Sequence, residues 1–325
     1  MPTPDIARCT DDGEWDRFVA SSPQGSVFTS SAFLQSLGEE CERWLVRENG
    51  VPVLAAPILV RDGQTLPQPY AFTQYIGPMF SGAFEQQPSH RRVPLHLRLL
   101  EFLLLELVAR YPAFSFSLHP ALNDVRAFQW LHYHTPELGR MAINPVYTGR
   151  LALDATAELS AYLEKVRTVR RQEFRKVEGL GYTRQDGDYA TLDRLHELTF
   201  ARQGLARSER EVRLLRSITN TALERGFGHC HIARSPAGET ASAVFFIHDQ
   251  DAAYYLFGAN DPELRKTGAG SWLLIQAIEQ ARQAGRRFID FVGVNSPNRG
   301  DFKTSFNAEP VVYFNVAWKR PIASA

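Results

Sequence analysis

Hydrophobic and polar positions follow the same order twice along this chain. Residues 44–59 and 231–246 each read as a strand, a glycine turn and a second strand. Later in each half, the pattern predicts an apolar helix and then a short buried strand: 95–110 and 114–118, then 271–284 and 288–292. The pattern therefore predicts one α/β fold used twice, with mixed sheets flanked by helices.

A boundary between the two copies is expected near residue 150. Asn144-Pro145 and the strand-like residues 146–153 precede Asp154, which begins a segment with the acceptors and acidic first turn of a helix start. This helix is expected to be apolar on one side at first (Leu159, Tyr162, Leu163, Val166, Val169) and basic afterwards. The 325 residues suit two domains, at 1–150 and 151–325.

The second copy carries an arrangement that suits a bound phosphate. A strand is expected over Asp251 to Phe257 and should end at Gly258, and an amphipathic helix follows from Ser271. Glycines at the start of that helix would let unpaired main-chain N–H groups approach an anion. The planar guanidinium of Arg265, three residues before the first of these glycines, could bind the same anion. An ordinary loop with a capping role is the alternative. The residues expected at this donor site are Phe257, Gly258, Arg265, Thr267, Gly268, Ala269, Gly270 and Ser271. The first copy has Gln87 to Pro94 at the equivalent place, which suits a loop.

Composition narrows the function classes. The 36 basic and 36 acidic residues cancel, which disfavours DNA as a main partner. Three cysteines without metal-like spacing indicate reduced thiols, and no apolar run is long and uncharged enough to span a membrane, so a cytoplasmic protein is expected, as a monomer or homodimer. The histidine pairs His132/His134 and His229/His231 would each share a strand face, but two ligands are too few for zinc, and no metal is expected.

Two resemblances follow from these motifs. Arg265-x-x-Gly268-x-Gly270, between a strand and a helix, resembles the acyl-CoA pyrophosphate signature of the GNAT acyltransferase superfamily. Four further segments are similar, in the right order, to the Fem family of peptidoglycan bridge-forming aminoacyltransferases: 74–79, 168–182, 284–294 and 300–306. The resemblance implies two tandem GNAT-like domains, each a mostly antiparallel sheet flanked by helices.

The chain also departs from the Fem pattern. Asn307 stands where that family has glycine after Phe306, and asparagine tolerates the same left-handed backbone. No long coiled-coil arm follows the basic helix. Related soluble acetyltransferases of the same two-domain type are the nearer match, which implies acyl-CoA or acetyl-CoA as a co-substrate and no permanently bound cofactor.

The implied mechanism is attack of an acceptor amine on a thioester. Main-chain N–H groups where strand 255–258 parts from strand 289–293 are expected to bind the oxyanion. The expected catalytic residues are Lys303, Tyr255 and Asp290, although Lys303 also reads as a surface lysine and Asp290 as a hydrogen-bonded core carboxylate. Proton loss to water stays open. Substrate contacts are expected in a cleft between the domains, from Gln74, Tyr75, Arg171, Arg175, Asn295 and Phe306.

Three functions are consistent with the sequence. The first is an N-acyltransferase that uses acyl-CoA to modify an amine of a small molecule, an envelope precursor or a polysaccharide precursor. The second is a Fem-like aminoacyltransferase that takes its acyl group from charged tRNA and acts on a peptidoglycan precursor. The third is a binding scaffold that keeps the fold without catalysis.

Overall fold

The computed structural model describes residues 4–84, 86–202 and 204–321. The backbone divides into unit 1, made of Met1–Val146 and Val312–Ala325, and unit 2, made of Tyr147–Val311. The first crossing is close to the expected boundary near residue 150. The segment after Val312 was expected in the second domain, but its residues 315–319 pair with 113–117 of unit 1. Backbone pairing between segments about 200 residues apart leaves no local signal in the sequence.

Unit 1 contains a five-stranded antiparallel sheet in the order β1-β2-β3-β4, with β5 also on β3. The predicted 44–59 hairpin is the β2–β3 pair. The elements of this unit are β1 Asp5–Arg8, α1 Asp12–Ser21, η1 Val27–Thr29, α2 Ser31–Ser36, β2 Glu40–Glu48, β3 Val51–Arg61, β4 Gln64–Thr65, β5 Met79–Phe80, η2 Gly82–Phe84, α3 Ser89–Arg110, β6 Ala113–Ser117, α4 Arg126–Trp130 and η3 Pro136–Leu138. The strands β7 Ala142–Ala152 and β13 Glu309–Lys319 cross between the units.

Helix α3 fills the core of unit 1. Its buried leucines at 99, 100, 103, 104 and 107 pack on side chains of the β2–β3 hairpin and on β6. The helix begins at Ser89, so the loop expected up to Pro94 is wrong. Pro94 is the sixth helical residue and lacks the N–H that would bond the carbonyl of His90. The buried leucine face that follows outweighs this loss.

Unit 2 is a mixed sheet in the order β7-β12-β11-β10-β9-β8, parallel only between β11 and β12. The predicted 231–246 hairpin is the β9–β10 pair. The elements of unit 2 are α5 Leu159–Lys165, α6 Thr168–Gly179, β8 Thr183–Asp186, α7 Tyr189–Arg202, α8 Glu209–Glu224, β9 Gly228–Arg234, β10 Thr240–His248, β11 Ala252–Asn260, η4 Arg265–Thr267, α9 Ala269–Gln283, β12 Phe288–Asp290 and α10 Pro297–Thr304.

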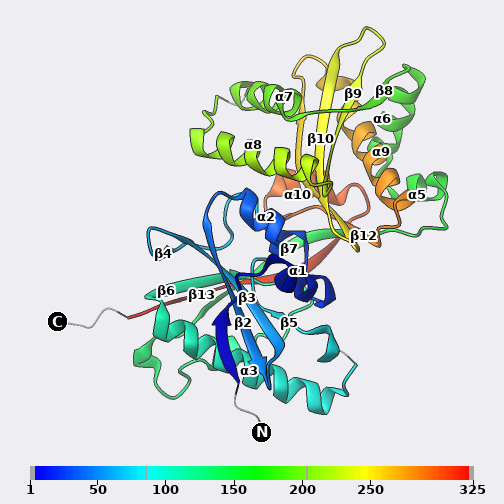
Figure 1. Cartoon of the computed structure of the whole chain (residues 1–325). Coiled ribbons are helices and arrows are strands. Elements are labelled where there is room, and N and C mark those ends of the chain that lie inside the picture. Colours follow the sequence, from blue (N-terminus) through cyan, green and yellow to red (C-terminus); the bar gives the residue numbers. More distant parts are fainter. Residues whose placement is uncertain (1–3, 85, 203, 322–325) are drawn as a thin grey trace. The chain divides into compact units, whose positions relative to one another are not determined.

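Helices cover both faces of this sheet (Figure 1). Helix α9 packs with α6 on one side, where Val244, Phe246 and Ile289 belong to the same core as eight buried residues of α9. Helices α7 and α8 pack on β9, β10 and β11. Adjacent strand residues face opposite ways, so both of these layers stay apolar. These findings confirm the predicted α/β class with mixed sheets flanked by helices.

Two details of unit 2 differ from the prediction. Strand β11 runs through Gly258 to Asn260 instead of stopping at the glycine. The helix expected after Asp154 is two helices, α5 and α6, because the chain is extended at Val166 and Arg167. There the Arg167 N–H donates to the Ser305 carbonyl at 2.9 Å and the guanidinium makes a bidentate pair with Asp301, and Val169 is exposed instead of apolar-packed. Tertiary partners outweigh local helix propensity at this point.

No helix in the described ranges is long and apolar enough to cross a bilayer.

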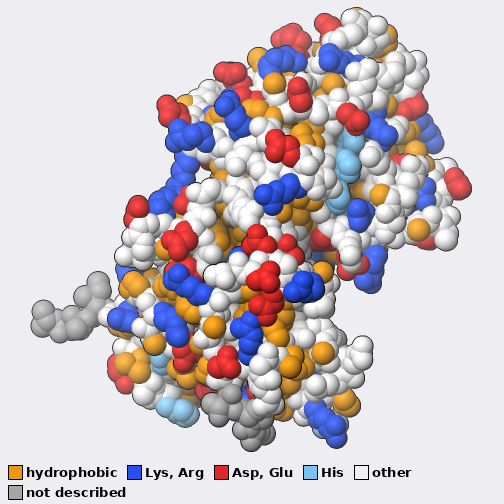
Figure 2. All heavy atoms as spheres, in the orientation of Figure 1, with side chains coloured by type: hydrophobic (Ala, Val, Ile, Leu, Met, Phe, Trp, Pro, Cys, Tyr) orange, Lys and Arg blue, Asp and Glu red, His pale blue; other side chains and the backbone are white. Residues whose placement is uncertain are grey.

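Residues 132–134 form a turn after α4, so the expected strand around His132 and His134 is wrong. Basic and acidic side chains are mixed over the face shown in Figure 2, in keeping with the balanced net charge. The described part of the chain has no group of three or more His, Cys, Asp or Glu placed to hold a metal.

Three histidines of unit 2 stack in a row on β9 and β10. The ring of His229 lies 5.9 Å from that of His231 and 5.1 Å from that of His248, and both pairs are nearly parallel. A strip of histidine side chains is visible over unit 2 in Figure 2. Burial lowers the pKa of His231 and of His248 to about 4 each and also lowers the pKa of His229. The folded row is therefore neutral.

This row predicts acid destabilisation. The unfolded histidines titrate near 6.5, so unfolding takes up protons between about pH 6.5 and 4, and the free energy of unfolding should fall over that window and level off below it. The buried His231 alone should account for a loss on the order of 3 kcal/mol. Urea unfolding between pH 7 and 4 tests this. His231→Gln should flatten the slope and the exposed-residue control His90→Gln should not; an unchanged slope in His231→Gln would contradict the assignment.

Candidate functional site

Two neighbouring strands of unit 2 part in mid-sheet. Strands β11 and β12 pair in parallel over three residues only, ending at Tyr254 opposite Asp290. On its other side, β11 has a bulge against β10, because Phe246 faces Tyr255 and Phe245 faces Phe257, which leaves Leu256 as the extra residue. A bulge takes backbone groups out of the ladder and is common beside active sites. The strands thus part where the sequence analysis expected.

The side chain of Lys303 lies at this opening. Its Nζ donates to the carbonyl oxygens of Val292 at 3.0 Å and Gly293 at 2.9 Å, just after β12. The same atom is 6.0 Å from the centre of the Tyr255 ring. Burial lowers the pKa of Lys303 to about 8, against a smaller opposing effect of Asp290. Lys303 is therefore no ordinary surface lysine, because its amine can lose a proton near neutral pH.

Asp290 is a core carboxylate. Its side chain is fully buried and accepts hydrogen bonds from the Thr148 hydroxyl at 2.5 Å, the Val292 N–H at 2.8 Å and the Arg150 Nε at 3.2 Å. The oxygens of this buried carboxylate are occupied by three donors, so Asp290 has no direct route to a substrate. The general-base role considered from the sequence does not fit this position.

Tyr255 packs in the same opening, against Phe246 and Phe291. Burial raises the pKa of its hydroxyl to about 12, so the phenol stays protonated at neutral pH. Its hydroxyl lies over the backbone of Gly258, where a Cβ would be 1.9 Å from the oxygen. Phe257 is buried and stacks on Phe245, 6.1 Å between ring centres. Gly258 is thus required by Tyr255, and Phe257 is a core residue rather than a donor contact.

The front of α9 lies against α6. Gly268 has φ of 93° and is the N-cap, as the glycine pattern predicted, and the Thr267 hydroxyl accepts from the Ala269 N–H at 3.2 Å. Gly268, Ala269 and Ser271 are buried. The Ser271 hydroxyl accepts from Arg170 at 3.1 Å, and Arg170 also pairs with Glu173.

The two glycines of the expected cradle also meet protein atoms. A Cβ on Gly268 would lie 2.8 Å from the Cβ of Glu173, and one on Gly270 would lie 2.3 Å from Oδ1 of Asn260. Packing within the chain therefore accounts for both glycines. The close approach of backbone to a ligand that the motif suggested is not needed to explain them.

Three basic side chains are exposed where α6 meets this helix start. They are Lys176 of α6 and Arg265 and Lys266 of η4. The two elements touch, since Lys176 Nζ lies 3.4 Å from the Lys266 carbonyl. Arg175 of α6 is also exposed, and Arg171, one turn before it, is partly exposed. We call Lys176, Arg265 and Lys266 the basic edge, because they place fixed positive charge at the positive end of a helix dipole.

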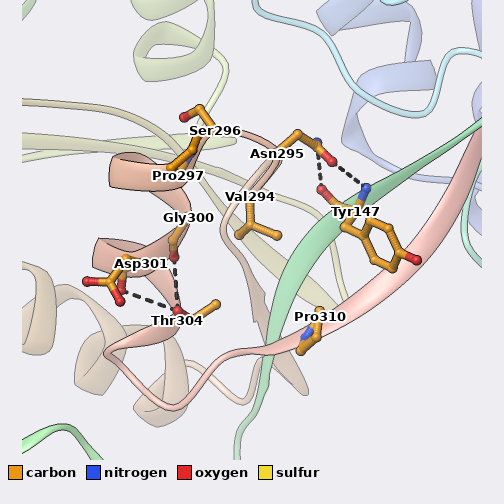
Figure 3. A pocket seen from close by; sticks show the side chains of 9 residues that line it. All are labelled: Tyr147, Val294, Asn295, Ser296, Pro297, Gly300, Asp301, Thr304 and Pro310. Carbon is orange, nitrogen blue, oxygen red and sulfur yellow. Dashed lines mark hydrogen bonds between the residues drawn. The ribbon is translucent and has the colours of Figure 1, made fainter.

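A pocket of about 580 Å³ lies between α10 and the strands β7 and β13 (Figure 3). Asn295, expected to bind substrate, lines it, but both ends of its amide are used: Oδ1 accepts from the Tyr147 N–H and Nδ2 donates to the Tyr147 carbonyl, each at 2.8 Å. The side chains and backbone around the pocket belong to Tyr147, Val294, Asn295, Ser296, Pro297, Gly300, Asp301, Thr304 and Pro310. A second pocket of about 490 Å³ lies between α7 and α8. Residues 265–271 line neither.

Three of the expected substrate contacts are buried instead. Phe306 is fully buried and packs on Phe291 and Phe302. In unit 1, Tyr75 has φ of 55° and its ring meets those of Phe28, His119 and Tyr313. Gln74 beside it is 4% exposed. Phe306 and Tyr75 are therefore core side chains, which contradicts the expectation that they face a substrate. Gln74 is buried as well, and its amide nitrogen has no hydrogen-bond partner among the described residues.

The comparisons with known proteins agree with this arrangement. Residues 164–304 match the family described as Acetyltransferase (GNAT) domain. This part of unit 2 is therefore similar to a GNAT domain. The matched residues include the parted strands, the bulge and helix α9 described above. A search of curated proteins found no match to the sequence.

Solved structures share the fold over the whole chain at low identity. FemX has a TM-score of 0.68 at 13% identity, covering 95% of this chain and 96% of that one. A conserved protein of unknown function from Bacteroides thetaiotaomicron has 0.60 at 12%, with 98% and 100% covered. A tandem GNAT protein from the clavulanic acid biosynthesis pathway has 0.56 at 14%, with 99% and 100% covered. The chain thus shares its two-domain fold with FemX and with a tandem GNAT protein.

Two side chains that shape this site, Thr148 and Arg170, were not predicted, because their partners lie far away in the sequence. Thr148 bonds Asp290 across 142 positions, and Arg170 reaches Ser271 across 101. Thr148 carries no motif. The arginine-rich run around Arg170 was noticed, but nothing in its spacing shows which arginine turns inward.

Asn307 confirms one prediction made from the family pattern, because its φ is 66°. We therefore expect Asn307→Gly to keep the free energy of unfolding within about 0.5 kcal/mol, and Asn307→Ala to lower it by about 1–2 kcal/mol, since a Cβ without a polar group is penalised in the left-handed region. Urea denaturation of both variants measures this. Equal stability of the alanine and glycine variants would contradict the backbone argument.

Proposed function

We propose that this protein is an N-acyltransferase that moves an acyl group from acyl-CoA to an amine. The observation that carries the proposal is the opening between β11 and β12, with a bulge on one side and the amine of Lys303 on the other. A thioester carbonyl placed there would meet main-chain donors. The GNAT match over residues 164–304 supports this reaction class.

The chemistry needs an oxyanion site and a route for one proton. Backbone N–H groups freed at the Leu256 bulge suit the oxyanion, because fixed dipoles stabilise developing charge without reorganising. Tyr255, with its pKa raised to about 12, is already protonated at neutral pH, and the oxygens of Asp290 are occupied by hydrogen bonds inside the protein. Of the three catalytic residues expected from the sequence, Lys303 alone suits proton transfer near neutral pH.

The donor's phosphates would bind at the basic edge. Lys176, Arg265 and Lys266 are exposed together at the front of α9, so an anion there gains from both their charges and the helix dipole. The buried backbone of Gly268 and Ala269 contributes through the dipole rather than by direct contact. In this proposal the diphosphate lies beside the start of α9 and makes no direct contact with the N–H groups there.

A second candidate is an aminoacyltransferase with a charged tRNA as donor. The observation in its favour is that Arg170 and Glu173 of α6 cover the start of α9, where a CoA diphosphate would need access. The basic edge would serve a nucleic-acid phosphate equally well. Activity that is lost on RNase treatment of the donor, and is absent with every CoA thioester, would select this candidate.

A donor screen tests the proposal at the level of reaction class. CoA and acyl-CoA thioesters of graded chain length should raise the melting temperature, because a ligand that binds the folded state stabilises it by mass action. The thioester giving the largest shift should also give amide product with a panel of amines, followed by release of free thiol. No shift with any thioester at millimolar concentration would count against an acyl-CoA donor.

Charge removal at the basic edge tests the donor position. We expect Arg265→Ala with Lys266→Ala to raise the CoA dissociation constant about tenfold or more, equivalent to ~1.4 kcal/mol for each tenfold step. Arg213→Ala removes an equally exposed arginine from α8 and is the matched control. Glycine variants are unsuitable, because a side chain at 268 or 270 would clash with Glu173 or Asn260. Unchanged affinity in the double variant by isothermal titration would overturn this position.

A further inference from the structure

The chain that follows β12 is held to β7 by main-chain and side-chain hydrogen bonds. After Asp290 it leaves β11, and the Phe291 N–H donates to the Gly149 carbonyl at 2.9 Å. The Gly293 N–H then donates to the Thr148 hydroxyl oxygen at 3.2 Å, and that hydroxyl donates to Asp290. The Val292 N–H is held by the same carboxylate oxygen. Thr148 and Asp290 together thus satisfy two successive amides of the 291–294 turn.

This turn holds a residue in an unfavourable backbone conformation. Val292 has φ of 51°, and Gly293 follows with φ of 79°. A β-branched residue in the left-handed region is rare and costs about 1–3 kcal/mol, and such strain is kept where the surroundings fix it and concentrates at functional sites. The buried bonds of Asp290 and Thr148, both fully buried, supply that fixation here.

The consequence of the turn is that two successive carbonyls accept from one amine. Lys303 Nζ lies 3.0 Å from the Val292 oxygen and 2.9 Å from the Gly293 oxygen. A neutral amine has two N–H bonds and one lone pair, while an ammonium has three N–H bonds. When the amine donates to both carbonyls, the nitrogen has one position left, which holds the lone pair of the neutral amine or the third N–H of the ammonium. We call the two carbonyls the carbonyl seat of Lys303. The seat therefore fixes the direction in which Lys303 can take up or release a proton.

We propose that Lys303 is the proton carrier of acyl transfer and that Thr148 and Asp290 are positioning residues that hold its carbonyl seat. This inference rests on the proposed function. The acceptor amine attacks the thioester carbonyl and the N–C bond forms. Neutral Lys303 takes the proton from that nitrogen, the C–S bond breaks, and the lysine returns the proton to the leaving thiolate. Amide and thiol result, and no further reactant is needed.

The charged and titratable groups around Lys303 are compatible with this cycle. Asp290 on β12 favours the ammonium, whereas Arg299, one turn earlier on α10, opposes it. Arg150 on β7 pairs with Asp290 and reduces its effect, and Tyr255 on β11 stays neutral. Burial is the largest of these influences, and it leaves the pKa of the amine at about 8. Both protonation states are accessible near neutral pH.

Two pairs of variants of the full-length protein test the proposal. Lys303→Arg keeps the charge but cannot deprotonate, so it separates a proton carrier from a fixed cation. We expect wild-type kcat to rise with pH through an apparent pKa of about 8, and Lys303→Arg to lose that dependence together with at least about a hundredfold in kcat. Full activity with an unchanged pH profile in Lys303→Arg would overturn the proton-carrier role.

The seat is tested by Thr148→Val against Thr148→Ser, which keeps the hydroxyl. Thr148→Val should loosen the turn and admit water, which moves the pKa of Lys303 back toward its ordinary value and lowers kcat at pH 7 about tenfold for each unit, with KM little changed. Thr148→Ser should keep the wild-type pH profile. Circular dichroism of each variant confirms folding. A wild-type profile in folded Thr148→Val would overturn the positioning role.

Amine labelling separates this inference from the proposed function. The rate at which an amine reagent modifies Lys303, followed against pH by peptide mass spectrometry, reports its titration without any turnover. Titration near 8 in the wild type and a higher value in Thr148→Val would support the seat even if no thioester were used, in which case the proposed function and the proton-carrier role would fall together. Titration near 10.5 in the wild type would overturn the seat itself.

Discussion

The site depends on which strand the chain bonds to after Asp290. Main-chain pairing alone would let β12 continue beside β11 and close the sheet. Instead, a buried carboxylate and a buried hydroxyl bond the next amides and fasten the segment to β7. An unpaired buried amide is costly, so these two side chains hold the path together with the main-chain bonds from Phe291 to Gly149 and from Val294 to Tyr147. The opening, the strained valine and the seat of Lys303 all follow from that one choice.

Three glycines of unit 2 that suggest a binding motif are explained by packing within the protein. Gly258, Gly268 and Gly270 suggested backbone exposed to a ligand, yet each has a protein side chain where its Cβ would be. Tyr255, Glu173 and Asn260 need these positions small. The motif still marks the turn from β11 into α9. Contact with the donor is then left to charged side chains at its edge.

Much of the fold could be predicted because its signals are local. The two hairpins, the helices ending near Arg110 and Gln283 and the left-handed Asn307 each follow from periodicity or turn chemistry within a few residues. The early start of α3 and the break before α6 could not, because packing and the bonds of Arg167 outweigh propensity there. In the site, Lys303 was found by its motif. Its neutral seat was not, since Thr148 and Asp290 are far apart in sequence and meet only through the sheet.

The return of the chain to its first unit has a consequence for biosynthesis. Strand β6 is made within the first 117 residues, but its partner is the last strand of the described chain. A ribosome releases residues in order, so an edge of unit 1 waits unpaired while some 190 further residues emerge, and unpaired strand edges invite wrong pairing. The nascent chain therefore carries an exposed strand edge of its first unit until β13 has been made.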